Sequence, residues 1–170
     1  MIIVEADLRR LVRKVLFERE ESLARVKEEE VEVVFPDEIF DKKAGAGKDL
    51  LMKGSQDGEI SGFVKPKDVS IKRAGIYFDN KLVGFMTPRE ERGAWRVGAI
   101  YVDEDVRKRV KGIGGIAISK FFEGREAADL LIGVNNKASQ SAFSKAGFEN
   151  TGEMYKDDSD GWEATWWSRR

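Results

Sequence analysis

The segment from residue 107 to residue 115 has the composition of an anion-binding loop. It reads Arg-Lys-Arg-Val-Lys-Gly-Ile-Gly-Gly and lies between an expected strand and an expected helix. Backbone N–H groups at a helix N-terminus lack intrahelical partners, and the helix dipole adds partial positive charge there. Glycine lets an anion approach the backbone closely, and the Arg and Lys side chains add charge. The segment therefore predicts a phosphate or pyrophosphate site; the alternative is that the glycines only let the helix pack against a strand.

Acid–base chemistry in this chain must come from a small set of groups, because the sequence contains no Cys and no His. These absences exclude a disulfide framework, a thiolate nucleophile, a zinc ribbon, a Ser-His-Asp triad and an imidazole metal site. Carboxylates, Tyr, Lys, the chain termini and water remain as proton carriers. We therefore expect no metal cofactor.

A second stretch rich in Gly and Lys, residues 41–49, does not fit a nucleotide-binding P-loop. Lys42 stands where the first Gly is required, and Asp49 replaces the Ser or Thr. We therefore reject nucleotide hydrolysis. Residues 36–70 as a whole are rich in Gly, Asp, Lys and Ser, and we expect them to form an irregular exposed loop, an insertion or lid that gates substrates.

The elements expected around the candidate loop alternate between strands and helices. Residues 2–4 predict a strand, and the apolar spacing from Asp7 to Val26 predicts an amphipathic helix that ends in a solvated Glu run. Further strands are predicted at residues 71–78, 82–86, 95–102 and 129–134, helices at 116–122 and 138–146, and a C-terminal hairpin from 152–155 and 162–167. This order predicts one mixed α/β (α+β) domain over residues 1–170.

Charge and hydropathy narrow the class of protein. Thirty Lys and Arg against 31 Asp and Glu leave a net charge of −1, which argues against binding nucleic acid or a membrane by bulk electrostatics. No apolar run is long enough to cross a bilayer, and the N-terminus becomes charged at Glu5, unlike a signal peptide. We expect a cytoplasmic protein with no membrane partner.

In context, the loop resembles the acyl-CoA loop of GNAT-type N-acetyltransferases. Arg109, Gly112 and Gly114 match that family's Arg-x-x-Gly-x-Gly, and the preceding strand ends in Ile-Tyr-Val at residues 100–102. Residues 76–85 resemble the family's second and third strands, and the opening residues 1–7 resemble its first strand.

The resemblance continues downstream of the loop. Asn136, Ser139, Phe143 and the Gly-Phe pair at 147–148 resemble the family's Asn…Ala…Tyr…Gly-Phe helix. Because these matches occur in the right order over most of the chain after residue 71, they are more specific than the glycine loop alone.

The resemblance implies a splayed mixed β-sheet of about six to seven strands flanked by helices. In the family, the strand matching residues 100–102 separates from the next strand, here 130–134, and the pantetheine arm enters the gap. It implies direct transfer of an acetyl group from acetyl-CoA to an amine, with the backbone N–H of Val102 polarising the thioester carbonyl. The implied cofactor-binding residues are Ile100, Tyr101, Val102, Arg109, Val110, Lys111, Gly112, Ile113, Gly114, Gly115, Asn136 and Phe143.

The chain departs from the family pattern at the position of the general acid. Phe143 stands where the family often has Tyr, and a Phe side chain cannot protonate the leaving thiolate. Either the CoA thiolate leaves without help, or another hydroxyl from Ser139, Ser141 or Tyr155 replaces the missing one.

The position of the general base also departs from the pattern. No carboxylate lies in residues 95–102, where the family often has one. Glu90, Glu91 and Glu163 are candidates from neighbouring segments, acting through water; the alternative is that they are surface carboxylates. The segment between Val102 and Gly112 is also about two residues longer than usual in the family, so we expect its Arg and Lys at 107 and 108 to bulge outward.

The acceptor is not identified by the sequence, but two groups of side chains bear on it. A basic patch would favour an anionic acceptor or nucleic acid, unless it is strand-edge charge; it comprises Arg89, Arg92 and Arg96. An aromatic group would line an acceptor pocket or stack bases, unless it packs in the core or in a homodimer interface; it comprises Trp162, Trp166 and Trp167.

We therefore expect an acetyl-CoA-dependent N-acetyltransferase whose partners are an acyl-CoA and an amine. Two alternatives remain: a degenerate CoA-binding or interaction module without turnover, and an acyltransferase acting on a nucleic acid. The last would show salt-dependent retention on DNA or RNA that weakens when Arg89 and Arg92 are replaced by Ala.

Overall fold

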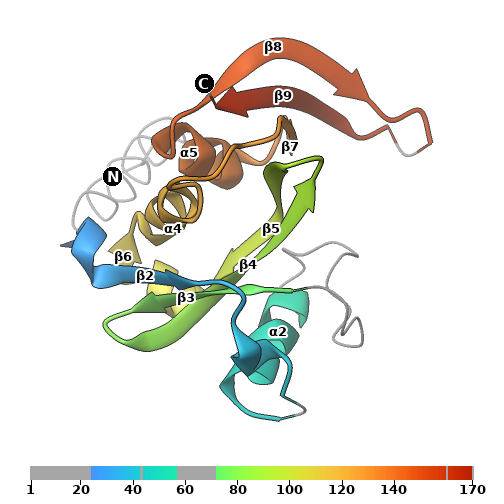
Figure 1. Ribbon diagram of the computed structural model, residues 1–170. Coiled ribbons are helices and arrows are strands. Elements are labelled where there is room, and N and C mark those ends of the chain that lie inside the picture. Colours follow the sequence, from blue (N-terminus) through green and yellow to red (C-terminus); the bar gives the residue numbers. More distant parts are fainter. Residues whose placement is uncertain (1–23, 43, 57–71, 160, 170) are drawn as a thin grey trace, which may run out of the picture.

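The computed structural model describes residues 24–42, 44–56, 72–159 and 161–169, and two antiparallel sheets dominate it (Figure 1). The first sheet has the order β2-β3-β4-β5, and the second has the order β7-β9-β8. The strands of the first sheet are β2 Val31–Val34, β3 Ala74–Phe78, β4 Lys81–Glu91 and β5 Ala94–Val102. The strands of the second sheet are β7 Leu130–Gly133, β8 Phe148–Lys156 and β9 Glu163–Arg169.

Helices connect and cover these strands. The α-helices of the described residues are α2 Ala46–Gln56, α3 Glu104–Arg107, α4 Ile113–Phe121 and α5 Lys137–Lys145. Two 3-10 turns, η1 Glu28–Glu30 and η2 Glu38–Phe40, precede α2. A pair of two-residue strands, β1 Ala24–Arg25 and β6 Val110–Lys111, lies in parallel beside α4.

The two faces of the first sheet carry different helices (Figure 1). On one face, buried Ile76 and Met86 belong to the main core together with Ala117 and Ile118 of α4. On the other face, a smaller core forms around α2, in which Leu50, Leu51 and Phe40 pack with Phe85 and Tyr101. Adjacent residues of β4 and β5 thus enter different cores, as expected for strands buried on both faces.

β5 and β7 run side by side only where they begin. The N–H of Trp95 donates to the carbonyl of Glu126 and the N–H of Ala128 donates to the carbonyl of Trp95, both at 2.8 Å. These bonds form an isolated parallel bridge between Trp95 and Ala127. Beyond it, no ladder joins β5 to β7 in the described part of the chain, so the two sheets are separate. The splayed sheet that the resemblance implied is therefore present.

A bulge in β5 contributes to this separation. Met86 pairs with Ile100 and Pro88 with Val97, so β5 has one residue more than β4 between these pairs. A β-bulge bends its strand and increases the local twist. The bend lies at residues 98–99, between the bridge and the C-terminal end of β5.

Downstream of residue 71, the predicted order of elements is confirmed by β3, β4, β5, α4, β7, α5 and the hairpin of β8 and β9. Upstream, residues 2–4 and most of the predicted N-terminal helix lie outside the described residues. The end of that helix prediction is wrong, because residues 24–25 form a strand. The strand next to β3 is β2, which the sequence pattern did not indicate.

The prediction of an irregular loop at residues 36–70 is wrong for residues 46–56, which form α2. The sequence pattern did not indicate this helix because the segment contains glycines, and Gly is a poor helix former. In the structure Gly47 and Gly54 are buried, and a Cβ at Gly47 would collide with the carbonyl of Ile39. The missing side chain therefore lets the helix approach the preceding turn closely.

Asp37 ties the segment before α2 to the first sheet. Its carboxylate accepts hydrogen bonds from the backbone N–H of Ile39 at 3.0 Å and from the Tyr77 hydroxyl at 2.8 Å. Burial, reinforced by this hydrogen bond, raises the pKa of Tyr77 to about 12. Gly75 leaves room for the carboxylate, because a Cβ at that position would collide with it.

We predict that Gly75→Ala lowers the free energy of unfolding by about 1–3 kcal/mol, because it displaces Asp37 and breaks these hydrogen bonds. Gly98→Ala is the matched control, since its Cβ would meet Thr87 at an ordinary contact distance of 3.5 Å. Chemical denaturation of both variants measures the difference. Equal stability of the two variants would show that the tether contributes little.

Candidate functional site

An open cleft of about 630 Å³ lies between the end of β5, the start of α4 and one side of α5. It opens where β5 and β7 have separated. The cleft is lined by Ile100, Val102, Arg107, Val110, Lys111, Gly112, Ile113, Gly114, Gly115, Asn136, Ala138, Ser139, Ser141, Ala142 and Lys145.

The three glycines of the predicted loop have different structural roles. Gly112 is the N-cap of α4 with a φ of 104°, a left-handed conformation that favours glycine, and no side chain caps the helix. Gly114 keeps the cleft open, because its Cβ would lie 3.7 Å from Ile100 Cδ1. Gly115 lets α4 pack on α5, because its Cβ would lie only 3.2 Å from Lys145 Cβ. The packing interpretation therefore holds for Gly115, whereas Gly112 and Gly114 lie where the cleft is open.

The cleft is basic. Arg107, Lys111 and Lys145 line it, and its lining contains no carboxylate. Together with the uncapped N–H groups at the start of α4, these cations can hold a polyanionic ligand.

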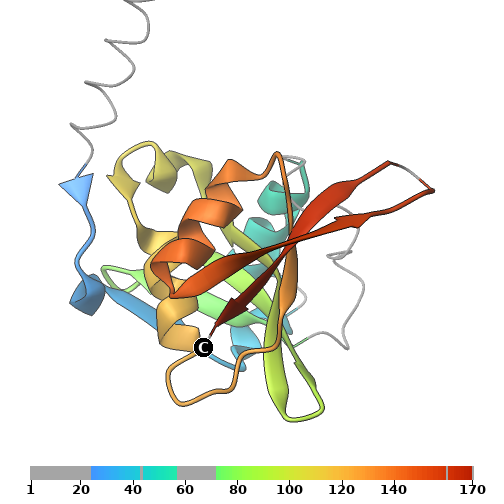
Figure 2. The ribbon, with the colours of Figure 1, turned by 90° about the horizontal axis from the view of Figure 1, so that it is seen from above.

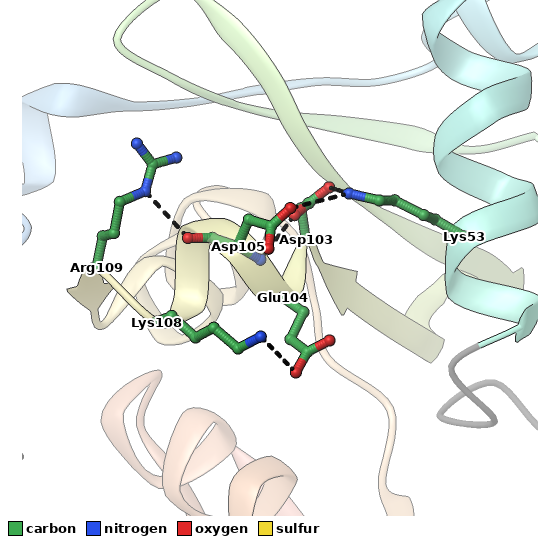
Figure 3. Close-up of polar contacts among 6 residues, drawn as sticks. All are labelled: Lys53, Asp103, Glu104, Asp105, Lys108 and Arg109. Carbon is green, nitrogen blue, oxygen red and sulfur yellow. Dashed lines mark hydrogen bonds and ion pairs between the residues drawn. The ribbon is translucent and has the colours of Figure 1, made fainter.

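The expectation that Arg107 bulges outward is wrong, whereas Lys108 does point outward. Arg107 lines the cleft, with its guanidinium carbon 5.9 Å from the centre of the Tyr101 ring. Lys108 pairs with Glu104 at 3.0 Å (Figure 3). Arg109 does not line the cleft either: its Nε donates to the carbonyl of residue 105 at 3.0 Å. The longer segment forms the helical turn α3, and as a result Arg107 lines the cleft in place of Arg109.

Asp103 connects the end of β5 to α2 and to α3 (Figure 3). Its carboxylate accepts hydrogen bonds from Lys53 Nζ at 2.7 Å and from the N–H of Asp105 at 2.8 Å, while its own N–H donates to Val83. Partial burial would raise the pKa of Asp103, but the two hydrogen bonds outweigh it and hold the pKa below its usual value. The bond to Asp103 in turn raises the pKa of Lys53. The residue after Val102 is thereby anchored on both sides.

We predict that Lys53→Gln increases amide hydrogen exchange in α2 at neutral pH, because it releases the helix from Asp103. Asp103→Asn should have a smaller effect, since the amide oxygen still caps α3 and Lys53 keeps its second ion pair, with Asp105 at 3.4 Å. Asp103→Ala should destabilise the protein further by about 1 kcal/mol, the usual cost of a lost cap. Because the pKa of Asp103 is lowered, the tether acts above the ordinary carboxyl pKa of 3.8 and is lost as the pH falls through its folded-state value.

Lys48→Gln, an exposed substitution on the same helix, controls for the loss of one positive charge. Exchange rates in α2 that are identical for Lys53→Gln and Lys48→Gln at neutral pH would refute the tether.

The backbone of β5 faces the gap at the predicted positions. Tyr101 pairs with Phe85, and the N–H of Asp103 donates to Val83, so both turn toward β4. Backbone groups alternate along an antiparallel strand, and those of Ile100 and Val102 therefore point away from β4, toward β7. The Tyr101 side chain lies in the core instead of the cleft.

The two predicted residues of α5 have different surroundings. Asn136 lines the cleft, and its side chain caps α5 by accepting a hydrogen bond from the N–H of Ser139 at 3.0 Å. Phe143 is buried in the main core, edge-on to Phe148 at 5.3 Å between ring centres, and does not line the cleft. Sequence reasoning named Ser141 but missed Ala138, Ala142 and Lys145, although the spacing of positions 138, 141, 142 and 145 marks one face of a helix.

The candidate bases do not reach the cleft. Glu90 pairs with Trp95 and Glu91 with Ala94, at the closed end of the hairpin formed by β4 and β5. At the usual rise of a strand, this end lies about 20 Å from Val102. Glu163 pairs with Lys156 at 3.5 Å in the C-terminal hairpin.

Tyr155, predicted as a substitute acid, does not line the cleft, whereas Ser139 and Ser141 do. The predicted basic patch lies beside Glu90 and Glu91, and Arg96 pairs with Glu91 at 3.4 Å. Of the predicted aromatic group, Trp167 is buried in the main core and Trp162 is exposed.

No model of a known protein family and no curated protein matches the sequence. Solved structures match its fold. The microcin C7 self-immunity acetyltransferase MccE, in complex with acetyl-CoA and AMP, has a TM-score of 0.57 at 13% identity over 81% of this chain and 91% of that chain. A GNAT-family acetyltransferase from Streptococcus pneumoniae has a TM-score of 0.55 at 10% identity over 81% and 97%. The Salmonella typhimurium acetyl transferase that modifies the N-terminal serine of ribosomal protein L7/L12 has a TM-score of 0.56 at 17% identity over 81% and 92%.

The chain therefore has the GNAT fold, as the spacing of the residues in its glycine loop and in the following segments predicted. At these identities the likeness concerns the fold and not the substrate. Among the described helices, none is long and apolar enough to span a membrane. No group of three potential metal ligands comes together in the described part of the chain.

Proposed function

We propose that the protein is an acetyl-CoA-dependent N-acetyltransferase that transfers the acetyl group to an amine by direct attack. The observation that carries this proposal is the position of the basic cleft. It lies at the start of α4, beside the point where β5 and β7 diverge. One site can thus hold a polyanion at one end and present backbone groups in a gap at the other.

The residues of the cleft fit acetyl-CoA. The uncapped N–H groups that follow Gly112 would hold the pyrophosphate, and the cationic side chains of Arg107, Lys111 and Lys145 would surround the phosphates. The backbone groups of Ile100 and Val102 that point away from β4 would bind the pantetheine arm. A volume of about 630 Å³ lies within the usual range of ligand pockets.

Acetyl-CoA supplies an activated acetyl group, and the chain supplies its orientation and polarisation. The N–H of Val102 would stabilise the negative charge that develops on the carbonyl oxygen as the amine attacks. A C–N bond forms, the C–S bond breaks, and the amine loses one proton. Because no carboxylate lines the cleft, water would accept this proton. The thiolate leaves as such or takes a proton from Ser139 or Ser141.

Gly114→Glu should abolish binding of acetyl-CoA and free CoA, because it places an anion between Ile100 and Ala142 beside the expected pyrophosphate. We expect a loss of at least about 100-fold in affinity, measured by calorimetric titration. Ser144→Glu is the matched control, since it adds the same charge at an exposed position of α5 outside the cleft lining. Unaltered affinity in Gly114→Glu would show that the loop is not the pyrophosphate site.

Combined replacement of Ser139 and Ser141 by Ala should lower kcat about tenfold or more with little change in the KM for acetyl-CoA, the pattern of a lost proton donor. The measurement is steady-state release of CoA. An unchanged kcat would show instead that the thiolate leaves without a donor from this helix.

A CoA-binding protein without turnover is the second candidate function. It is favoured by the lack of a carboxylate in the cleft lining and by the buried Phe143. Calorimetric binding of acetyl-CoA with no CoA release over a broad panel of amines would decide for this candidate.

A further inference from the structure

We propose that the acceptor is a small diamine or polyamine, whose second, protonated amino group binds to an aromatic pair formed by Tyr155 and Trp162. This inference rests on the proposed transferase function and names its substrate class.

The aromatic pair lies on the sheet face opposite the cleft. Leu130 and Ile132 of β7 enter the main core that α4 and α5 cover, so the alternate position, Gly133, faces the other side. Trp162 lies over Gly133, because a Cβ there would be 3.2 Å from the Trp162 Nε1. The centre of the Tyr155 ring lies 6.0 Å from the centre of the Trp162 ring. Tyr155 pairs with Ala164 of β9, and Ala164 also pairs with Gly133 of β7.

The pair is nevertheless close to the cleft along the chain. Gly133 ends β7, and Asn136, three residues later, lines the cleft on the other face. Gln140 of α5 holds this connection by donating to the carbonyls of Gly133 and Val134 at 3.0 and 3.1 Å. An acceptor bound at the pair would approach the gap from the face opposite the cleft, and its amine would meet the thioester in the gap, as direct transfer requires.

Both rings of the pair are accessible, although large aromatic side chains are usually covered. Trp162 is 44% exposed and Tyr155 is 38% exposed. In contrast, Trp167 on the other face is buried, with its indole N–H bound to Thr165 at 2.9 Å. The second sheet thus has one packed face and one face that presents rings at the end of β7.

The charge around the pair selects a cation. The described residues 153–159 and 161–163 contain four Asp or Glu against one Lys, Lys156, which already pairs with Glu163. Asp157 stays ionised, because its hydrogen bonds with Ser159 lower its pKa. An ammonium group over an indole or phenol face is attracted by the ring quadrupole, and nearby carboxylates add to this attraction. The nucleophilic amine itself must be neutral to attack, so the group held here is a second amine of the same molecule.

The hairpin of β8 and β9 projects beyond the rest of the described fold (Figure 2). In this view it points in a different direction from the β4–β5 hairpin, which carries Arg89, Arg92 and Arg96. This separation of charge lets a polyanionic donor and a polycationic acceptor bind to one small protein at the same time.

The test compares acceptors in steady-state assays with acetyl-CoA. Three have a four-carbon chain: 1,4-diaminobutane as the diamine, butylamine as the monoamine and 4-aminobutanoate as the anionic amine. Spermidine is the longer polyamine. We expect the diamine and spermidine to have kcat/KM at least about tenfold above butylamine, and 4-aminobutanoate to be the poorest. Trp162→Ala should lower kcat/KM for the diamine about tenfold, a larger loss than for butylamine, so that the preference for the diamine is lost. Trp162→Phe, which keeps a ring, should lie between Trp162→Ala and the unmodified protein.

Met154→Ala is the control on the same hairpin, since Met154 is 58% exposed and lies outside the pair. Calorimetric affinity for acetyl-CoA should be the same in all variants, which shows that they are folded. Turnover without preference for diamines, or equal diamine kinetics in Trp162→Ala and Met154→Ala, would overturn this inference while leaving the transferase function intact. Binding of acetyl-CoA without acetylation of any of these amines would also overturn this inference, whereas failure of the unmodified protein to bind acetyl-CoA would overturn the proposed function itself.

Discussion

The divergence of β5 from β7 is the constraint on which the rest of the structure depends. One parallel bridge, between Trp95 and Ala127, joins the two sheets, and the bulge at residues 98–99 bends β5 after it. From there on, the backbone groups of β5 that face away from β4 have no strand beside them among the described residues. Buried backbone groups need partners, so a gap of this kind must be filled by water or by a ligand with its own amides. The other elements of the fold are therefore arranged around the gap between β5 and β7.

The elements around the gap have different structural roles. α4 begins at the open end with an uncapped N-terminus, and α5 covers the adjoining wall with small side chains. The short turn α3 orients Arg107 toward the cleft, and Asp103 anchors that turn to α2 through Lys53. Each element is small, but together they place positive charge at one end of the gap. The opposite face of the second sheet carries the exposed rings of Tyr155 and Trp162, so the two faces of this sheet differ in chemistry.

Local pattern was sufficient where a segment interacts mainly with its neighbours along the chain. The alternation of the β3–β4 hairpin, the left-handed Gly147 after α5 and the turn between β8 and β9 all depend on nearby residues, and each was predictable. α2 was not, because its glycines lower helix propensity and only packing against the first sheet compensates for that cost. The exchange of Arg107 and Arg109 was not predictable either, since one helical turn changes the direction of each side chain by about 100° per residue.

The sequence by itself determined the order of strands and helices after residue 71 and the position of a glycine-rich helix start beside a basic segment. Spacing encodes these features directly, because the strand and helix periods are properties of the local backbone. The tertiary structure decided which side chains meet. It placed Glu90 and Glu91 at the far end of a hairpin, buried Phe143 and Tyr101, and brought Lys145 to the cleft and Trp162 to Gly133. Such contacts depend on the twist of two sheets and on helix packing across many residues, which no local pattern records.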